Sequence, residues 1–500
     1  MLDMMATGFS LIFTVQGILF ICGGTMLGIV FGAIPGITVT MGIALFLPLT
    51  FSMDPINGLA LLCGLYIGGT SGGLISAILL NIPGTPASVA TCFDGHPMAR
   101  RGEAGRAISI GIIVSFIGGM LSLVVLILVA PVLAKVTLQF GSFEYFSIAL
   151  FSLTMISGLS GKSMLQGITS GLIGMALALV GTAPISAFNR YTFGIDELFT
   201  GFSLLPVLVG LFAVSQVLAA AFDKNRIDAE KAVLTKLDKV PFSLRDLKGQ
   251  TKNIMVSAGI GTGIGILPGL GASICNIIAY SVVKKMSKYP EKFGTGIPDG
   301  IVASETSNNA STGGAMVPLM TLGIPGDNAT AIILGGFIIH GITPGPMLFM
   351  RHGDLAYAVF AALIFANLVM IVGEFLGIKL FTKVLLVPRH ILLAIVMVFC
   401  TIGAYGTNSQ VFDVITMLIF GLLGFGLSRL KFPLAPVILG YILGPIIETN
   451  LRRGLMQSRG SFLPFITEPI SGACLAVTVI VVTCIIVSQL KKRKSERAAA

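Results

Sequence analysis

Two short stretches place oxygen-bearing side chains beside helix-breaking residues. The first, NIPGTPAS, runs from Asn81 to Ser88, and the second, GIPGDNAT, contains Asp327 and Asn328. Proline removes a backbone donor and glycine permits dihedrals closed to other residues, so an IPG sequence unwinds a membrane helix. Unwound carbonyls beside neutral side-chain oxygens suit a sodium ion, while half-helix N-termini suit a carboxylate. Each stretch therefore predicts a place that holds a cation and an anionic solute.

The polar run SETSNNASTGG at 304–314 precedes the second stretch and adds further candidate ligands. Freed backbone groups persist in a membrane only inside protein or beside a wet cavity, so we expect the two breaks to meet near the bilayer midplane. Glu305, within the run, is either an ion ligand or a solvated loop acid. The candidate substrate-binding residues are Asn81, Pro83, Gly84, Thr85, Ser88, Asn309, Pro325, Gly326 and Asn328. The candidate sodium ligands are Asn308, Ser311, Thr312 and Asp327.

The elements that position these residues are membrane helices. The chain of 500 residues is 54% hydrophobic and only 11% charged, with a mean hydropathy of +0.95, which excludes a soluble globular protein. Four apolar runs carry few or no charges over the roughly 20 residues that a spanning helix needs: 108–132, 204–222, 355–378 and 473–490. Their periodicity differs from the alternation of barrel strands. We predict an all-α polytopic membrane protein with about 10–12 transmembrane helices, some of them interrupted or re-entrant.

The two halves of the chain repeat. GAIPGIT at 32–38 matches GILPGLG at 265–271, and TSGG followed by NIPGTPAS matches STGG followed by GIPGDNAT in the same order. Secondary transporters often build their site from inverted repeats with interrupted helices in corresponding positions, so we expect the halves to be inverted. The first pair of turns is either a pair of gates or a pair of tight packing elements, formed by Gly32, Pro35, Gly36, Pro268 and Gly269.

Charge distribution predicts the domain organisation. We expect an N-terminal membrane repeat (1–222), a basic linker (223–253), a C-terminal membrane repeat (254–490) and a basic tail (491–500). Lysine and arginine gather in the linker, the loops and the tail, which places the linker and the C-terminus in the cytoplasm. The first residues lack the basic region of a cleavable signal, so we expect insertion through the first helix.

Other chemistries have weak support. The seven cysteines form no CxxC pair, the four histidines form no HExxH motif, and GTGIGILPGLGAS lacks a preceding βαβ unit. We therefore expect no enzyme activity, no cofactor and no nucleic-acid partner. His340 is either a proton relay or a helix-end histidine that meets backbone carbonyls. The alternative to a transporter is a channel-like passive pore for small organic anions, in which the breaks form a filter.

Several motifs resemble one family over nearly the whole chain. Residues 66–99 and 304–349, the two LPG/IPG turns and KFPLAPVILGYILGPIIETNLRR at 431–453 resemble the large membrane subunit of the tripartite tricarboxylate transporters, the TctA family. The resemblance implies a multi-pass protein of the bacterial inner membrane that imports carboxylates such as citrate by symport with a cation, expected to be sodium. It also implies two partners, a small TctB-like membrane subunit and a periplasmic TctC-like solute-binding protein. Ser71 stands where the family usually has an aromatic residue.

Overall fold

The computed structural model describes residues 2–159, 164–222, 245–268, 271–384 and 389–499. These residues are almost entirely helical, with one antiparallel ribbon of β1 (Gly181–Thr182) and β2 (Asn189–Arg190). The helices of the first half are α1 (Leu2–Ile12), α2 (Val15–Ala33), α3 (Val39–Thr50), α4 (Pro55–Leu80), α5 (Val89–Met98), α6 (Ala104–Thr137), α7 (Ser142–Leu159), α8 (Met164–Ala178), α9 (Leu204–Val209) and α10 (Ser215–Phe222). Those of the second half are α11 (Thr251–Ile266), α12 (Gly271–Met286), α13 (Pro298–Leu322), α14 (Asn328–Ile339), α15 (Pro346–Arg351), α16 (Gly353–Val384), α17 (Arg389–Asn408), α18 (Val411–Arg429), α19 (Leu434–Gln457), α20 (Leu463–Thr467) and α21 (Pro469–Ala499).

The prediction of an all-α polytopic membrane protein is confirmed. Within the described part of the chain, seven helical segments are long and apolar enough to cross a membrane, and six further apolar helices are shorter. The predicted runs 108–132, 204–222 and 355–378 lie in three of the seven. The run 473–490 lies in α21, whose apolar part Pro469–Thr483 is one of the shorter helices. Residues 223–244 of the predicted linker lie outside the described residues, and α21 continues through residue 490.

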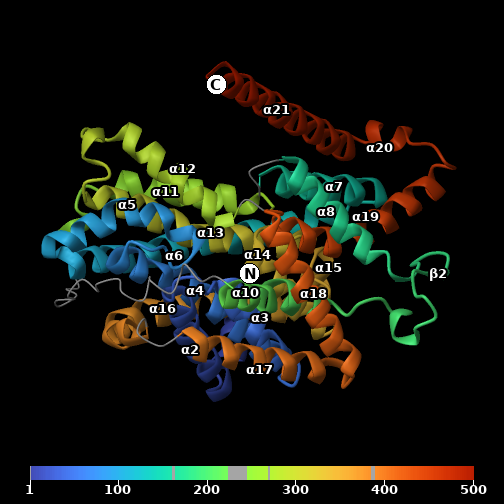
Figure 1. Ribbon diagram of the computed structural model, residues 1–500, viewed down its shortest axis with the longest axis horizontal. Helices are drawn as coiled ribbons and strands as arrows, with labels where there is room; N and C mark the ends of the chain where they lie inside the picture. Colours follow the sequence, from blue (N-terminus) through green and yellow to red (C-terminus); the bar gives the residue numbers. More distant parts are fainter. Residues whose placement is uncertain (1, 160–163, 223–244, 269–270, 385–388, 500) are drawn as a thin grey trace.

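Two matched helices, α4 and α13, form the centre of the protein (Figure 1). Every residue from 58 to 79 of α4 and from 300 to 321 of α13 is buried, and the two stretches begin and end 242 residues apart. Asn308 of α13 donates to the Thr70 carbonyl, whereas Leu74 and Ile301 meet beside Gly111 of α6. From residue 70 to residue 74 along α4, the neighbouring residue of α13 goes back from 308 to 301. These corresponding helices therefore run in opposite directions.

Glycine spacing brings each central helix close to its neighbour. On α2, Gly28 and Gly32 follow one another at the four-residue interval that puts them on one face, and both lie against the backbone of α4. On α11, Gly261 and Gly265 lie in the same way against the backbone of α13 at Ser307 and Ser311. The same close helix pair therefore occurs once in each half, as small residues at intervals of four allow in membranes.

Other helices cross from one half to the other. α19, from the end of the chain, packs on α7 and α8 of the first half, and Figure 1 shows these three helices together. In exchange, α9, α10 and the single π-helical turn Gly210–Val214 between them pack on α18 of the second half. Each half thus completes its outer layer with helices supplied by the other.

Candidate functional site

The first break joins α4 to α5. α4 ends at Leu80, and its C-cap Asn81 is exposed and has a left-handed backbone conformation with φ of 57°. The 3-10 turn Pro86–Ser88 then leads into α5, and its capping box is formed by Thr85 and Ser88. The Thr85 amide donates to Ser88 Oγ at 3.2 Å, and both side chains are buried. The amides of Gly84, Thr85 and Ser88 are therefore satisfied within the protein, as a membrane interior requires.

The second break joins α13 to α14 in the same way. α13 ends at Gly323, which is left-handed with φ of 71°, and α14 begins with a capping box between Asp327 and Thr330. The Asp327 amide donates to Thr330 Oγ1 at 2.9 Å, and the Thr330 amide donates to Asp327 Oδ1 at 2.7 Å. The second carboxylate oxygen, Oδ2, accepts a hydrogen bond of 2.7 Å from Tyr66 of α4. Thr85 and Asp327 thus have the same local role as N-caps.

This correspondence predicts the effect of exchanging the caps. Asp327→Thr places the residue of the first break in the second and should preserve the helix start, since threonine is also a good N-cap. Asp327→Ala should lower the free energy of unfolding by about 1 kcal/mol because it removes the cap. Thermal unfolding of the purified variants in detergent measures both, and equal stability of the two variants would contradict the assignment.

Both IPG glycines lie in matched contacts. A Cβ on Gly84 would collide with the carbonyl oxygen of Gly32, and a Cβ on Gly326 would lie 2.8 Å from the carbonyl oxygen of Gly265 and 2.6 Å from Ala315 Cα. The first IPG break therefore packs on the last turn of α2, which leads into the turn at Pro35. The second packs on the last turn of α11, which leads into the corresponding turn at Pro268. Gly32 has a packing role, while Pro35 and Gly36 are half-buried, Pro268 is buried, and Gly269 lies outside the described residues.

The start of α12 lies between the two breaks. Gly271 packs against Asp327, since a Cβ on this glycine would be 3.2 Å from Asp327 Cβ. One and a half turns later, the side-chain amide of Asn276 donates to the carbonyl of Ala87 at the first break. The structure thus brings the two predicted regions into contact with one short helical segment.

The predicted polar run is the buried interior of α13, so Glu305 is not a solvated loop acid. Its side chain is fully buried and accepts hydrogen bonds from Thr91 of α5, from Ser115 of α6 at 3.2 Å and from Asn308 at 3.5 Å. Asn309 donates to Ser115 at 2.7 Å. The residues of the run hold one carboxyl group in a polar cluster shared by α5, α6 and α13.

The predicted sodium ligands separate into two places. Asn308 lies beside Glu305, whereas the hydroxyls of Ser311 and Thr312 donate back to their own helix at 2.7 Å, to the carbonyls of Asn308 and Asn309. Asp327 lies at the second break with Tyr66. Among the predicted substrate residues, Asn328 is exposed at the start of α14, while Pro325 and Gly326 are buried.

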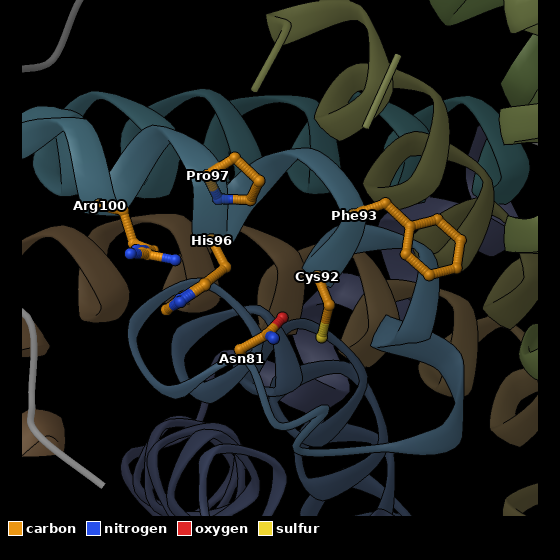
Figure 2. A pocket seen from close by; sticks show the side chains of 6 residues that line it. All are labelled: Asn81, Cys92, Phe93, His96, Pro97 and Arg100. Atoms are coloured by element: carbon orange, nitrogen blue, oxygen red, sulfur yellow. The ribbon is translucent and has the colours of Figure 1, made fainter. Parts of the chain in front are cut away.

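A cavity of about 490 Å³ opens beside the first break (Figure 2). It is lined by Asn81 from the end of α4 and by Cys92, Phe93, His96, Pro97 and Arg100, which follow one another along α5 and the turn after it. His96 Nδ1 lies 3.0 Å from the Ile78 carbonyl, so the tautomer that donates there leaves Nε2 to the cavity. In Figure 2 Cys92 extends toward Asn81. Arginine and histidine beside an amide are groups that can bind a carboxylate.

Sequence reasoning missed several residues of this region. Tyr66, Ser115 and the cavity residues His96 and Arg100 have no local motif, because their role depends on contacts between helices distant in sequence. Glu374 did carry a signal, as a single acid inside the apolar run 355–378. His340 ends α14 as one interpretation expected, but its Nε2 has no hydrogen-bond partner among the described residues, so it does not meet a carbonyl there.

Comparisons with known proteins agree with the resemblance seen in the motifs. Residues 18–439 match the model of the tripartite tricarboxylate transporter TctA family. An uncharacterized 52.8 kDa protein of the TAR-I ttuC' 3' region in Agrobacterium vitis is 35% identical over 493 residues, which cover 99% of this chain and 97% of that protein. An uncharacterized protein of the TAR-II ttuC' 3' region in the same organism is 36% identical over 237 residues, or 47% of this chain and 97% of its own length. No solved structure matches the chain.

Proposed function

Because this chain belongs to the tripartite tricarboxylate transporter TctA family, we propose that it is the large transmembrane subunit of a binding-protein-dependent secondary transporter. It imports small carboxylates, citrate or a related organic acid, and couples the import to a sodium gradient. It acts in the bacterial inner membrane with a small TctB-like subunit and a periplasmic TctC-like protein that delivers the solute.

The pair of matched, capped helix breaks is the observation that carries this proposal. Each break starts a half-helix whose N-terminal N–H groups and positive dipole end favour an anion, and α12 lies between the two. Two such breaks in corresponding places are typical of transporters that alternate access around a central site. The residues that we assign to the solute are those of the two breaks, with Asn81 and Asn328 as their exposed members.

The cavity of Figure 2 is the place where we expect the carboxylate to leave toward the cytoplasm. Arg106, on the next turns of the chain, pairs with Asp246 at the end of the basic linker at 2.6 Å. This contact with the linker supports a cytoplasmic opening for the cavity, since the positive-inside rule assigns basic loops to the cytoplasm.

Reconstitution tests the proposed function directly. Proteoliposomes that contain this chain and its small subunit should accumulate labelled carboxylate when the binding protein is present outside and a sodium gradient points inward. A passive pore would instead equilibrate the solute without a gradient and without the binding protein. That result would overturn the transporter proposal in favour of a channel.

The cavity makes a separate prediction. Arg100→Gln removes the exposed guanidinium and should weaken carboxylate binding from the cytoplasmic side about tenfold, a loss of roughly 1.4 kcal/mol for one charge-assisted contact. Counterflow in inside-out vesicles measures it. Arg101→Gln is the matched control, because it removes a positive charge that lies outside the cavity. The Arg101 guanidinium already donates to the carbonyls of Thr295 and Gly296. An equal effect of removing Arg453 on α19 would show that surface charge alone is responsible.

A further inference from the structure

Two fully buried carboxyl groups face the same stretch of α4. Glu305 lies on α13 and Glu374 on α16, and neither side chain is exposed to solvent. Ser71 of α4 donates to Glu374 Oε2 at 3.0 Å, while the preceding carbonyl of α4, at Thr70, accepts from Asn308, which also donates to Glu305. The two acids are thus connected through consecutive residues of one helix.

No buried lysine or arginine in the described ranges accompanies these acids. Among the buried side chains of the described residues there are aspartates and glutamates but no lysine or arginine. An isolated carboxylate in a membrane interior is costly, and such residues are typically paired, or lie on an ion or proton pathway. The hydrogen bonds that Glu305 and Glu374 accept come from neutral serine, threonine and asparagine groups, which supply no positive charge to balance an ionised carboxylate.

Two oxygen atoms of the same group lack a donor. Within the part of the chain that the structure describes, Glu374 Oε1 and Asn308 Oδ1 are buried and have no hydrogen-bond partner. Buried polar atoms without a partner are rare and call for an explanation. Both are acceptor oxygens beside two carboxyl groups, so a bound cation would supply their missing partner and balance the charge of the carboxylates that ligate it.

We propose that Glu305, Glu374 and Asn308, together with Ser71, form the binding site of one sodium ion between α4, α13 and α16. Carboxylate, amide and hydroxyl oxygens are the ligands of a hard monovalent cation. No set of three or more histidine, cysteine or acidic side chains in the described chain suits a transition metal. The site rests on the proposed function for its role, since it supplies the coupling ion of carboxylate import.

This site differs from the set predicted from the sequence. It retains Asn308 and replaces Asp327, whose carboxylate already caps α14 and accepts from Tyr66, with two acids that are deeper in the bundle. Glu374 is on α16, which packs on α2, α4 and α6, so the ion joins helices of both halves. Binding of sodium therefore stabilises one arrangement of α13 and α16 around α4.

Sodium binding can be measured without any solute. The purified protein is titrated with NaCl at fixed pH and constant ionic strength, with KCl as the replacement salt, and ²²Na⁺ binding and the melting temperature are recorded. The native protein should bind sodium and melt at a higher temperature in NaCl than in KCl, because a ligand of the folded state stabilises it. Glu374→Gln and Glu305→Gln should each weaken sodium binding at least tenfold and remove the shift.

A matched control separates the site from a general effect of buried acids. Asp413 of α18 is also buried and accepts a hydrogen bond of 2.8 Å from Asn408, so Asp413→Asn should retain the full sodium response. If a glutamine variant fails to fold, Asn308→Ala keeps both acids and should still weaken ²²Na⁺ binding. Full binding in Glu374→Gln and Asn308→Ala, or no sodium response in the native protein, overturns the proposal. Sodium binding without carboxylate uptake would contradict the proposed function and leave this site intact.

Discussion

Gly84→Ala is expected to abolish carboxylate uptake, and Gly326→Ala is expected to do the same. The added methyl group of the first variant collides with the carbonyl of Gly32, and that of the second lies 2.6 Å from Ala315 Cα. Both obstacles are backbone atoms of close-packed helices, so the break must move. Overpacking of this kind costs typically 1–3 kcal/mol, and at a binding site it also displaces the residues that hold the solute.

Two other glycines provide the control for this prediction. Gly259 and Gly263 lie on α11, and a Cβ at either position meets nothing within 4 Å. Gly259→Ala and Gly263→Ala should therefore leave uptake unchanged and raise helix stability slightly, since alanine favours helix more than glycine does. Uptake per folded molecule, measured in proteoliposomes, should be at least tenfold lower in the Gly84 and Gly326 variants than in these two controls. Similar activity in all four variants would show that the breaks tolerate displacement.

Asp94→Ala should prevent stable assembly of the protein. Asp94 on α5 is fully buried, and its Oδ1 accepts three backbone N–H groups, from Gly294 at 2.9 Å, Gly296 at 2.8 Å and Ile297 at 3.0 Å. Its Oδ2 accepts from Tyr280 of α12 at 2.8 Å. One substitution thus removes the acceptor of four donors, each of which costs about 1–3 kcal/mol when buried without a partner.

A substitution of Tyr280, which donates to Asp94, provides a smaller loss of stability for comparison. Tyr280→Phe removes only one of the four hydrogen bonds and should cost about 1 kcal/mol, while the loop from 294 to 297 remains anchored. We expect a lower melting temperature for Tyr280→Phe and loss of the folded fraction for Asp94→Ala in size-exclusion chromatography of detergent extracts. A folded Asp94→Ala protein with a melting temperature equal to that of Tyr280→Phe would refute the anchoring role.

Local motifs were sufficient to predict where the helices break. Proline and glycine act on their own backbone, so NIPGTP and GIPGDN could be assigned as interruptions and paired by order alone. Their correspondence extends to the caps, since Thr85 and Asp327 occupy the same position in the structure. The helical character of the apolar runs was likewise predictable, because spanning a bilayer requires a length and a composition that are local properties.

The polar core was not predictable in the same way. Hydropathy treats SETSNNASTGG as unsuited to a membrane interior, yet α13 is fully buried because α4, α6 and α11 surround it. The partners of Glu305 come from α5 and α6, about 200 residues away in sequence, and those of Glu374 from α4. No spacing rule relates such residues, so only the packed structure brings them together.

The burial of α13 has a consequence for how the protein enters the membrane. A helix with this many hydroxyl and amide groups and two acids, Asp299 and Glu305, gains little from lipid, so we expect the insertion machinery to retain it until a protein surface is available. That surface consists of α4 and α6, which are synthesised earlier: α6 presents Ser115 and Gly118 to α13, and α4 presents the carbonyl of Thr70. We therefore expect the N-terminal half to act as an internal chaperone for the C-terminal half, so that the order of the two repeats along the gene is not interchangeable.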